Sequence, residues 1–319
     1  MFNFKKNNVN TLFYKAFFAV IFSALIYGGN VVAGRLIADS IPPITLSALR
    51  AILALVILLP IAWPALKNAP KPNKKELLFL FLISILGVSL PYTALILGLA
   101  EASGTNASVI FATLPAATNA LLFLIYKIKP SKFQVWGIIT SFIGLLIVFT
   151  HGDLLHLLSF KLGKGEAFLF INVLSVSIFN IAGQNIMKKF SPIVTSIYTI
   201  GFAVLTLSPV GLWQSNSVAW HLSWSGWLIV IYMGCLAAGI AYFLNLYGIQ
   251  KLGSGRATII GYMQHVFSIT LSVLILKEVL TIYHFWGFLL VISGVILSLI
   301  SSPVESPKHV TPKNSKLTV

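Results

Sequence analysis

Long apolar stretches alternate with short polar connections along almost the whole chain. A membrane-spanning helix needs about 20 mostly apolar residues, and ten of these stretches come close to that length. The runs are continuous rather than alternating in polarity, which argues against a membrane β-barrel. The pattern predicts an all-α integral membrane protein with ten transmembrane helices. We expect spans at 16–38, 44–62, 77–99, 104–126, 133–150, 166–187, 192–213, 226–249, 255–276 and 282–301.

The composition agrees with a membrane protein. Hydrophobic residues make up 57% of the chain, charged residues 9%, and the mean hydropathy is +0.92. A soluble domain would carry roughly a quarter of charged residues. No polar connection is long enough to fold by itself, and we expect residues 303–319 to form a disordered cytoplasmic tail. The function must therefore reside in the membrane.

The distribution of charge predicts the topology. The net charge is +15, but the basic residues lie on alternate connections, as at 67–75 and 127–132, rather than along one surface. This arrangement argues against a nucleic-acid partner, and we expect the chain to contact membrane lipid. Because Lys and Arg favour cytoplasmic loops, we expect both termini in the cytoplasm and a multi-pass protein of the cytoplasmic (inner) membrane.

An offset of 150 residues places rare residues on one another and predicts an internal repeat. The matched positions are Trp63 and Trp213, Trp136-Gly137 and Trp286-Gly287, Gly144 and Gly294, Asn30 and Asn180, and Tyr92 and Tyr242. The repeats would be 1–153 and 154–302, each with five spans. Because five is odd, the second repeat would be inverted. Inverted repeats are typical of transporters, whose substrate pocket lies between them near the middle of the membrane. We expect a wet pocket there.

The spacing of four glycines predicts tight helix packing. Gly137 and Gly144 are seven residues apart, as are Gly287 and Gly294. Seven residues are about two helical turns, so each pair lies on one face of its helix. Small residues let helices approach closely in lipid. We therefore expect tight helix packing at these glycines rather than glycine as a tolerated filler.

Several motifs resemble the EamA type of the drug/metabolite transporter superfamily. They are Tyr27-Gly28 with Arg35 in span one, Pro43, Arg50 and Ala54 in span two, Ala107 and Pro115 in span four, and the closing run Glu278, Leu280, Thr281, Gly287, Gly294 and Val295. The resemblance covers about 16–301. It implies transport of small metabolites, mostly export of amino acids, with nucleotide sugars or drugs in some members.

The chain departs from this family pattern at three positions. Tyr27 stands where the family usually has Trp. Ile128 occupies the position that matches Glu278 in the other repeat, and His265 matches Pro115. The resemblance therefore leaves the substrate open.

Polar residues within spans are candidate substrate ligands, because buried polar groups are costly in lipid. Asn30 and Asn180 form one equivalent pair, and Tyr92 and Tyr242 form another. Further candidates share a helix face with these pairs or lie in spans four and nine: Asn245, Gln184, Thr113, Asn119, Gln264 and His265. The alternative for each is a hydrogen bond between helices, worth about 0.6 kcal/mol on average.

Three residues have more particular roles open to them. Pro91 and Pro115 would bend spans three and four and free a backbone carbonyl, with a gating or a purely architectural role. The His265 imidazole could carry a coupled proton or contact an anionic group. Arg50 has three open roles: its side chain reaches the membrane interface, pairs with an acid, or binds a carboxylate.

Missing motifs narrow the function. Cys235 is the single cysteine, and no phosphate-binding Gly-rich loop or hydrolase signature occurs, so we expect no cofactor, no metal and no enzymatic activity. The sequence predicts a secondary active transporter that exports small polar metabolites, such as amino acids, by alternating access, with protons as the candidate coupled ion. The alternatives are a lipid- or prenyl-transfer enzyme, a transporter of drugs or nucleotide-type solutes, and a receptor or scaffold.

Overall fold

The computed structural model describes residues 2–37, 40–101, 110–111, 113–150, 152–153, 163–276 and 281–300. These ranges are helical, with turns and short extended connections and no strand among them. The expected tail at 303–319 and Glu278 of the closing motif lie outside the described residues.

The helices follow the order of the apolar stretches. The first half contains α1 (Phe2–Ile37), α2 (Pro43–Asn68), α3 (Lys74–Ser84), the π-helical η1 (Ile85–Ser89), α4 (Leu90–Glu101), α6 (Leu114–Tyr126) and α7 (Lys132–Phe149). The second half contains α8 (Lys164–Ile186), α9 (Pro192–Ser217), α10 (Trp224–Ile231), the π-helical η3 (Tyr232–Ala241), α11 (Tyr242–Leu252), α12 (Ser254–Gly261), α13 (Met263–Leu276) and α14 (Ile282–Ile300).

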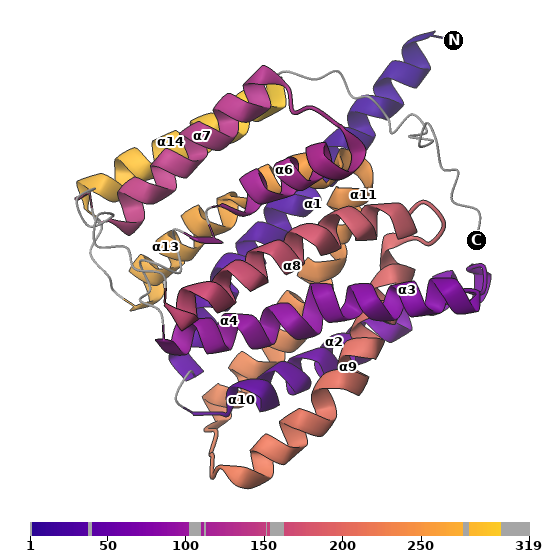
Figure 1. Ribbon diagram of the computed structural model, residues 1–319, viewed down its shortest axis with the longest axis vertical. Helices are drawn as coiled ribbons and strands as arrows, with labels where there is room; N and C mark the ends of the chain where they lie inside the picture. The colour runs from indigo at the N-terminus through magenta and orange to yellow at the C-terminus, as the bar shows by residue number, and fades with distance from the viewer. Residues whose placement is uncertain are drawn as a thin grey trace.

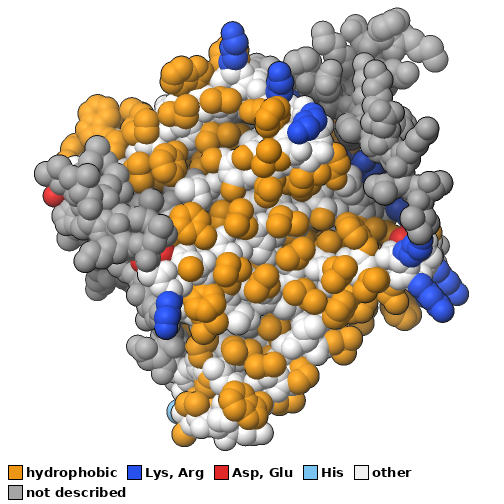
Figure 2. Space-filling view, in the orientation of Figure 1, with side chains coloured by type: hydrophobic (Ala, Val, Ile, Leu, Met, Phe, Trp, Pro, Cys, Tyr) orange, Lys and Arg blue, Asp and Glu red, His pale blue; other side chains and the backbone are white. Residues whose placement is uncertain are grey.

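The helical segments confirm a multi-pass membrane protein. Among the described residues, 7 helical stretches are long and apolar enough to cross a membrane. Three shorter apolar helices, Leu114–Tyr126, Lys132–Ile147 and Ile282–Leu297, coincide with the predicted spans four, five and ten. The total of ten spans therefore stays a prediction. Figure 2 shows hydrophobic side chains spread over the visible face, with Lys and Arg side chains at its edges, as a lipid-facing surface requires.

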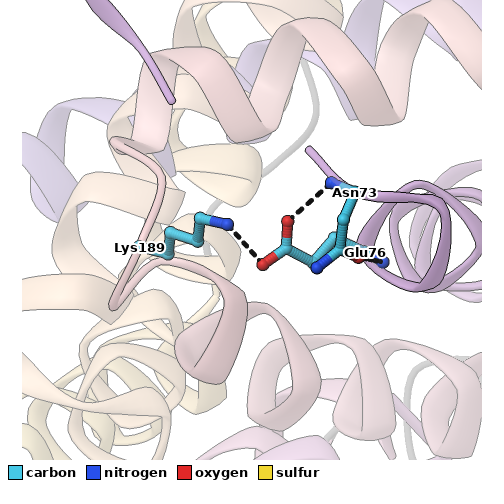
Figure 3. A network of polar contacts seen from close by, with 3 residues as sticks. All are labelled: Asn73, Glu76 and Lys189. Carbon is cyan, nitrogen blue, oxygen red and sulfur yellow. Dashed lines mark hydrogen bonds and ion pairs between the residues drawn. The ribbon is translucent and has the colours of Figure 1, made fainter. Parts of the chain in front are cut away.

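Local signals set several helix starts. Pro43 and Pro192 occupy the first turns of α2 and α9, where the missing N–H costs no intrahelical hydrogen bond. Asn73 and Glu76 form a reciprocal capping box at the start of α3. Glu76 also accepts a 2.5 Å ion pair from Lys189, which lies between α8 and α9 (Figure 3). This ion pair joins the two halves between two connections that carry basic residues.

The packing of helices follows the 150-residue offset. In Figure 1, α7 and α14 run side by side at one edge of the bundle. A second pair of equivalent helices, α2 and α9, also pack together. The remaining contacts come in matched sets: α1 packs on η3, α11 and α13, and α8 packs on η1, α4 and α6. Each half therefore buries its first helix against the third and fourth helices of the other half.

The predicted tight packing at the glycines is confirmed, and the structure shows that it joins α7 to α14 in a glycine seam. A Cβ added at Gly144 would lie 2.7 Å from the carbonyl oxygen of Gly287, and one added at Gly294 would lie 2.5 Å from that of Gly137. Ser141 donates a 3.2 Å hydrogen bond to the carbonyl of Val291 in the middle of the seam. The absence of side chains at the glycines lets the two backbones approach within contact distance.

Span nine is less regular than the apolar pattern suggests. Residues Ser254–Ile275 form one stretch long enough to cross a membrane, but α12 ends at Gly261 and α13 starts at Met263. The intervening Tyr262 donates its N–H to the carbonyl of Ile259, a tighter turn than an α-helix makes. Spans three and eight do run without a break, but each contains a π-helical segment. The pattern of apolar residues predicts neither the turn at Tyr262 nor the π-helical segments, because both kinds of irregularity keep the apolar residues buried.

Candidate functional site

A small hollow lies where the halves meet at the centre of the bundle. Its walls come from α2, η1, α4, α9, η3 and α11, through Ala51, Ala54, Val88, Tyr92, Ile200, Ala238 and Tyr242. Four of these residues form two pairs at the 150-residue offset, Val88 with Ala238 and Tyr92 with Tyr242. The predicted tyrosine pair is therefore brought together. The expected wet pocket is not seen here: the hollow has no space for a water molecule, because alkyl groups and two phenol rings fill it.

Each of these two tyrosines follows a π-helical segment. Tyr92 comes three residues after η1, and Tyr242 comes directly after η3. Single π turns inside α-helices are frequent at functional sites, because the extra residue rotates the following side chains to a new face. The sequence analysis predicted neither of these π-helical segments. The position of η1 beside Pro91 nevertheless has a chemical reason.

Pro91 accounts for η1. In a π turn the N–H of residue 91 would bond the carbonyl of Leu86, but proline has no N–H. The hydroxyl of Ser175 on α8 donates to that carbonyl instead. The Asn172 side chain, one turn earlier on α8, donates a 2.7 Å hydrogen bond to the carbonyl of Pro91 itself. The carbonyl that Pro91 frees is thus bonded to a neighbouring helix.

The Tyr242 ring is held on two sides. Its hydroxyl lies 3.0 Å from Thr199 Oγ1 of α9, and its ring stacks on Phe179 of α8 with centroids 5.9 Å apart. Asn180, the buried partner of Asn30 in the repeat, is the next residue after Phe179. These contacts fix the orientation of the Tyr242 phenol beside the hollow.

Tyr27 of α1 lies next to the aromatic residues of the hollow. Its side chain is within interaction range of Asn245, Tyr92, Tyr242 and Arg50. We refer to Tyr27, Arg50, Tyr92, Tyr242 and Asn245 as the central cluster. Tyr27 entered the sequence analysis only through a family motif. Its spacing of three residues from Asn30 was the signal that could have placed it on the same helix face.

Arg50 is the charged member of the central cluster. Its side chain is 8% exposed, so the interpretation that it reaches the membrane interface is wrong. The guanidinium carbon lies 4.8 Å from the centroid of the Tyr92 ring, a cation–π geometry. Its Nε is buried and has no hydrogen-bond partner among the residues described.

Asn30 is a second buried group with unused hydrogen-bonding capacity. It lies on α1 one turn beyond Tyr27, and its Oδ1 has no partner within the described part of the chain. Asn30 and Arg50 each lie seven residues from the helix ends that face the short connection between α1 and α2. They are therefore at similar depth in the bundle, about 10 Å from those ends.

Other predicted ligands form hydrogen bonds within the scaffold. Gln184 Oε1 accepts from the backbone N–H and the hydroxyl of Ser254 at the start of α12. Asn119 donates to the carbonyl of Pro115 at 2.8 Å, and the Thr113 hydroxyl donates to the carbonyl of Ile110. These three side chains stabilise the region around α6, α8 and α12 and lie outside the hollow's lining.

Pro115 does not kink a continuous helix. It lies in the first turn of α6, whose N-cap is Thr113, so the irregularity of span four precedes it. Tyr262, at the break of span nine, is 150 residues from Ala112, which directly precedes Thr113. His265 and Gln264 follow that break in the first turn of α13, with the His265 ring 6.4 Å from that of Tyr262. The helices α6 and α13 thus start within one residue of each other at the 150-residue offset.

The chain matches one protein family and is similar to several transporters. The EamA-like transporter family matches residues 14–150 and again residues 163–300. The chain is 25% identical to the uncharacterized transporter YetK of Bacillus subtilis (strain 168) over 291 residues, which covers 89% of this chain and 87% of YetK. An uncharacterized transporter of Archaeoglobus fulgidus is 23% identical over 277 residues, covering 86% and 93% of the two chains.

A solved structure shares the fold. A crystal structure of a protein that is 14% identical superposes with a TM-score of 0.75, over 90% of this chain and 99% of that one. At this identity the likeness concerns the fold alone.

Proposed function

Because the chain belongs to the EamA-like transporter family, we propose that it is a secondary active transporter that exports small polar metabolites, such as amino acids, by alternating access. The observation that carries the proposal is the central hollow, which equivalent residues of both halves line. A site between repeats lets one ligand contact both halves at once. Relative motion of the halves can then expose the ligand to either side of the membrane.

We further propose that the two halves are inverted five-helix repeats within ten spans. Two separate matches of the family, one for each half, support a duplication. The matched helix contacts support a twofold relation between the halves, since α7 meets α14 and α2 meets α9. The break at Tyr262 in span nine adds support, because discontinuous helices are typical of transporter binding sites.

The closed hollow fits one intermediate of such a cycle. Transport requires states in which the site opens to either side, and a symmetric scaffold gives two such states similar energy. The Glu76–Lys189 ion pair spans the halves at one end of the bundle. Both residues lie at connections that the charge pattern predicts to be cytoplasmic. The same pattern predicts both termini on the cytoplasmic side of the cytoplasmic (inner) membrane. Separation of the halves at that end would break this ion pair.

Reconstitution tests the proposed function. Purified protein in liposomes is loaded with an unlabelled amino-acid mixture and exchanged against each radiolabelled amino acid outside. We expect exchange of at least one solute above that of protein-free liposomes, with acceleration when a pH gradient is imposed if protons are coupled. The absence of exchange for amino acids and for a broader metabolite panel, in protein that remains folded, would refute the proposal.

A further inference from the structure

The charge of the central cluster is unbalanced. Arg50 is the basic member, and no carboxylate side chain of the described residues forms an ion pair with it. Glu76 is bonded to Lys189 and Asn73 at the start of α3, and Glu166 accepts from the backbone of Gly163 at the start of α8. Both carboxylates are therefore engaged at helix ends, and neither forms an ion pair with Arg50.

An unbalanced buried charge is costly unless something else pairs with it. Guanidinium groups lose strong hydration on burial, and an isolated ion is far less stable in an apolar site than a paired one. The Tyr92 ring face compensates in part, since cation–π contacts are stronger when desolvated. It offers no hydrogen-bond acceptor in the plane of the guanidinium, and the Nε donor stays unused.

We propose that Arg50 binds a carboxylate group of the transported solute. This inference rests on the proposed transport function and names the chemical class of its substrate. The guanidinium donors match the two oxygens of a carboxylate, and charge-assisted hydrogen bonds of this kind are the strong ones. A monoanion would neutralise the single Arg50 charge. A phosphate monoester carries −1.5 to −2 charges at pH 7 and would leave an excess negative charge in the site.

The hollow lies beside Arg50, whose guanidinium packs on the lining residue Tyr92, and its walls define the rest of the solute. Ala51, Ala54, Val88 and Ala238 present small apolar surfaces to the hollow, and Tyr92 and Tyr242 present ring faces. The solute is therefore expected to carry a compact apolar or aromatic part next to its carboxylate. The repeat-related position of Arg50 is Ile200, a residue of the hollow's lining, so the second half offers no matching cation. One carboxylate per solute follows from this asymmetry.

A comparison of acids with their amides tests this class on the unmodified protein. Liposomes containing the protein are loaded with a radiolabelled amino acid that shows exchange, or with propionate or benzoate. Each acid then competes with its primary amide and with a phosphate monoester of similar size. We expect the acid to compete at least about tenfold better than the amide, because a charge-assisted hydrogen bond contributes about 1.5–3 kcal/mol.

Variants connect the selectivity to Arg50. In Arg50→Gln the preference for acid over amide should fall below about threefold, and Arg50→Lys should keep a reduced preference, because Lys retains the charge without the planar fork. Lys67→Gln removes a positive charge from the cytoplasmic end of the same helix and serves as the matched control, with unchanged selectivity. If Arg50→Gln does not fold, the acid and amide comparison and Arg50→Lys still decide the question.

The outcomes separate this inference from the proposed function. Equal competition by acids and amides, or full acid selectivity in folded Arg50→Gln, would overturn the role of Arg50 while leaving transport intact. Stronger competition by the phosphate monoester would overturn the carboxylate class. Lack of exchange for every solute would refute the proposed function, and the present inference with it.

Discussion

Replacing either glycine of the α7–α14 seam should destabilise the protein without changing its affinity for substrate. A Cβ at Gly144 would lie 2.7 Å from the Gly287 carbonyl oxygen, 2.8 Å from Leu290 Cβ and 2.9 Å from Val291 N. Two of these atoms belong to the backbone, so no rotamer change can relieve the overlap. Gly294→Ala would be at least as severe, at 2.5 Å from the Gly137 carbonyl oxygen and 2.7 Å from Ser141 N.

The expected loss follows from the separation that the new methyl group demands. Ordinary contact begins at 3.4 Å, so the helices must move apart locally by about 0.7 Å at Gly144 and about 0.9 Å at Gly294. A gap of that size forfeits roughly a quarter to a half of the dispersion attraction of each facing atom pair. Overpacking of this kind typically costs about 1–3 kcal/mol. Gly144→Ala and Gly294→Ala should each lower the free energy of unfolding by about that amount.

Reversible unfolding in mixed detergent–lipid micelles measures this loss, and Gly201→Ala supplies the control. A Cβ at Gly201 on α9 meets no atom within 4 Å, so this change should raise the free energy of unfolding by about 0.5–1 kcal/mol through reduced backbone entropy. None of the hollow's lining residues belongs to α7 or α14, so half-saturation of exchange should stay constant in both seam variants. Unfolding free energies equal to wild type in both seam variants would refute the close contact of these helices.

Three further changes test other parts of the molecule. Arg50→Met should raise the free energy of unfolding of the ligand-free protein by about 1–3 kcal/mol, because it removes a buried charge that has no ion-pair partner among the described residues; a loss in thermal stability would contradict this. Glu76→Gln keeps the capping box but removes the exposed ion pair with Lys189, so unfolding should become slightly easier at low salt, and a difference that persists unchanged in 1 M salt would argue against an ionic origin. Tyr242→Phe removes the hydroxyl next to Thr199 but keeps the stacking on Phe179, so it should cost about 0.5–1.5 kcal/mol in unfolding free energy; a cost as large as that of Tyr242→Ala would show that the hydroxyl, not the ring, holds the site.

Apolar runs and rare-residue matches were enough to predict the membrane class and the order of helices. Hydrogen bonding explains this success, since a backbone in lipid has few alternatives to a helix and the runs therefore become helices. Tight packing at the glycines was predictable for a related reason, whereas the pairing of α7 with α14 came from the tertiary structure. A repeat of seven residues places two glycines on one helix face, and the same spacing recurs 150 residues later.

The composition of the site depended on the tertiary structure. The offset selected Tyr92 and Tyr242, and the structure places both beside one hollow. Gln184 and Asn119 were equally good candidate ligands in the sequence, yet both form hydrogen bonds within the scaffold. Sequence spacing gives the face of a helix, but the helix that this face meets depends on packing between distant segments.

Arg50 illustrates the same division. Its position in a span was evident from the sequence, and three roles for its charge were open there. Only packing decided that the side chain turns inward over the Tyr92 ring rather than outward to the interface. Local sequence fixes where a charged group enters the membrane, whereas its surroundings, and hence its energetic cost and its chemistry, come from helices far away in the chain.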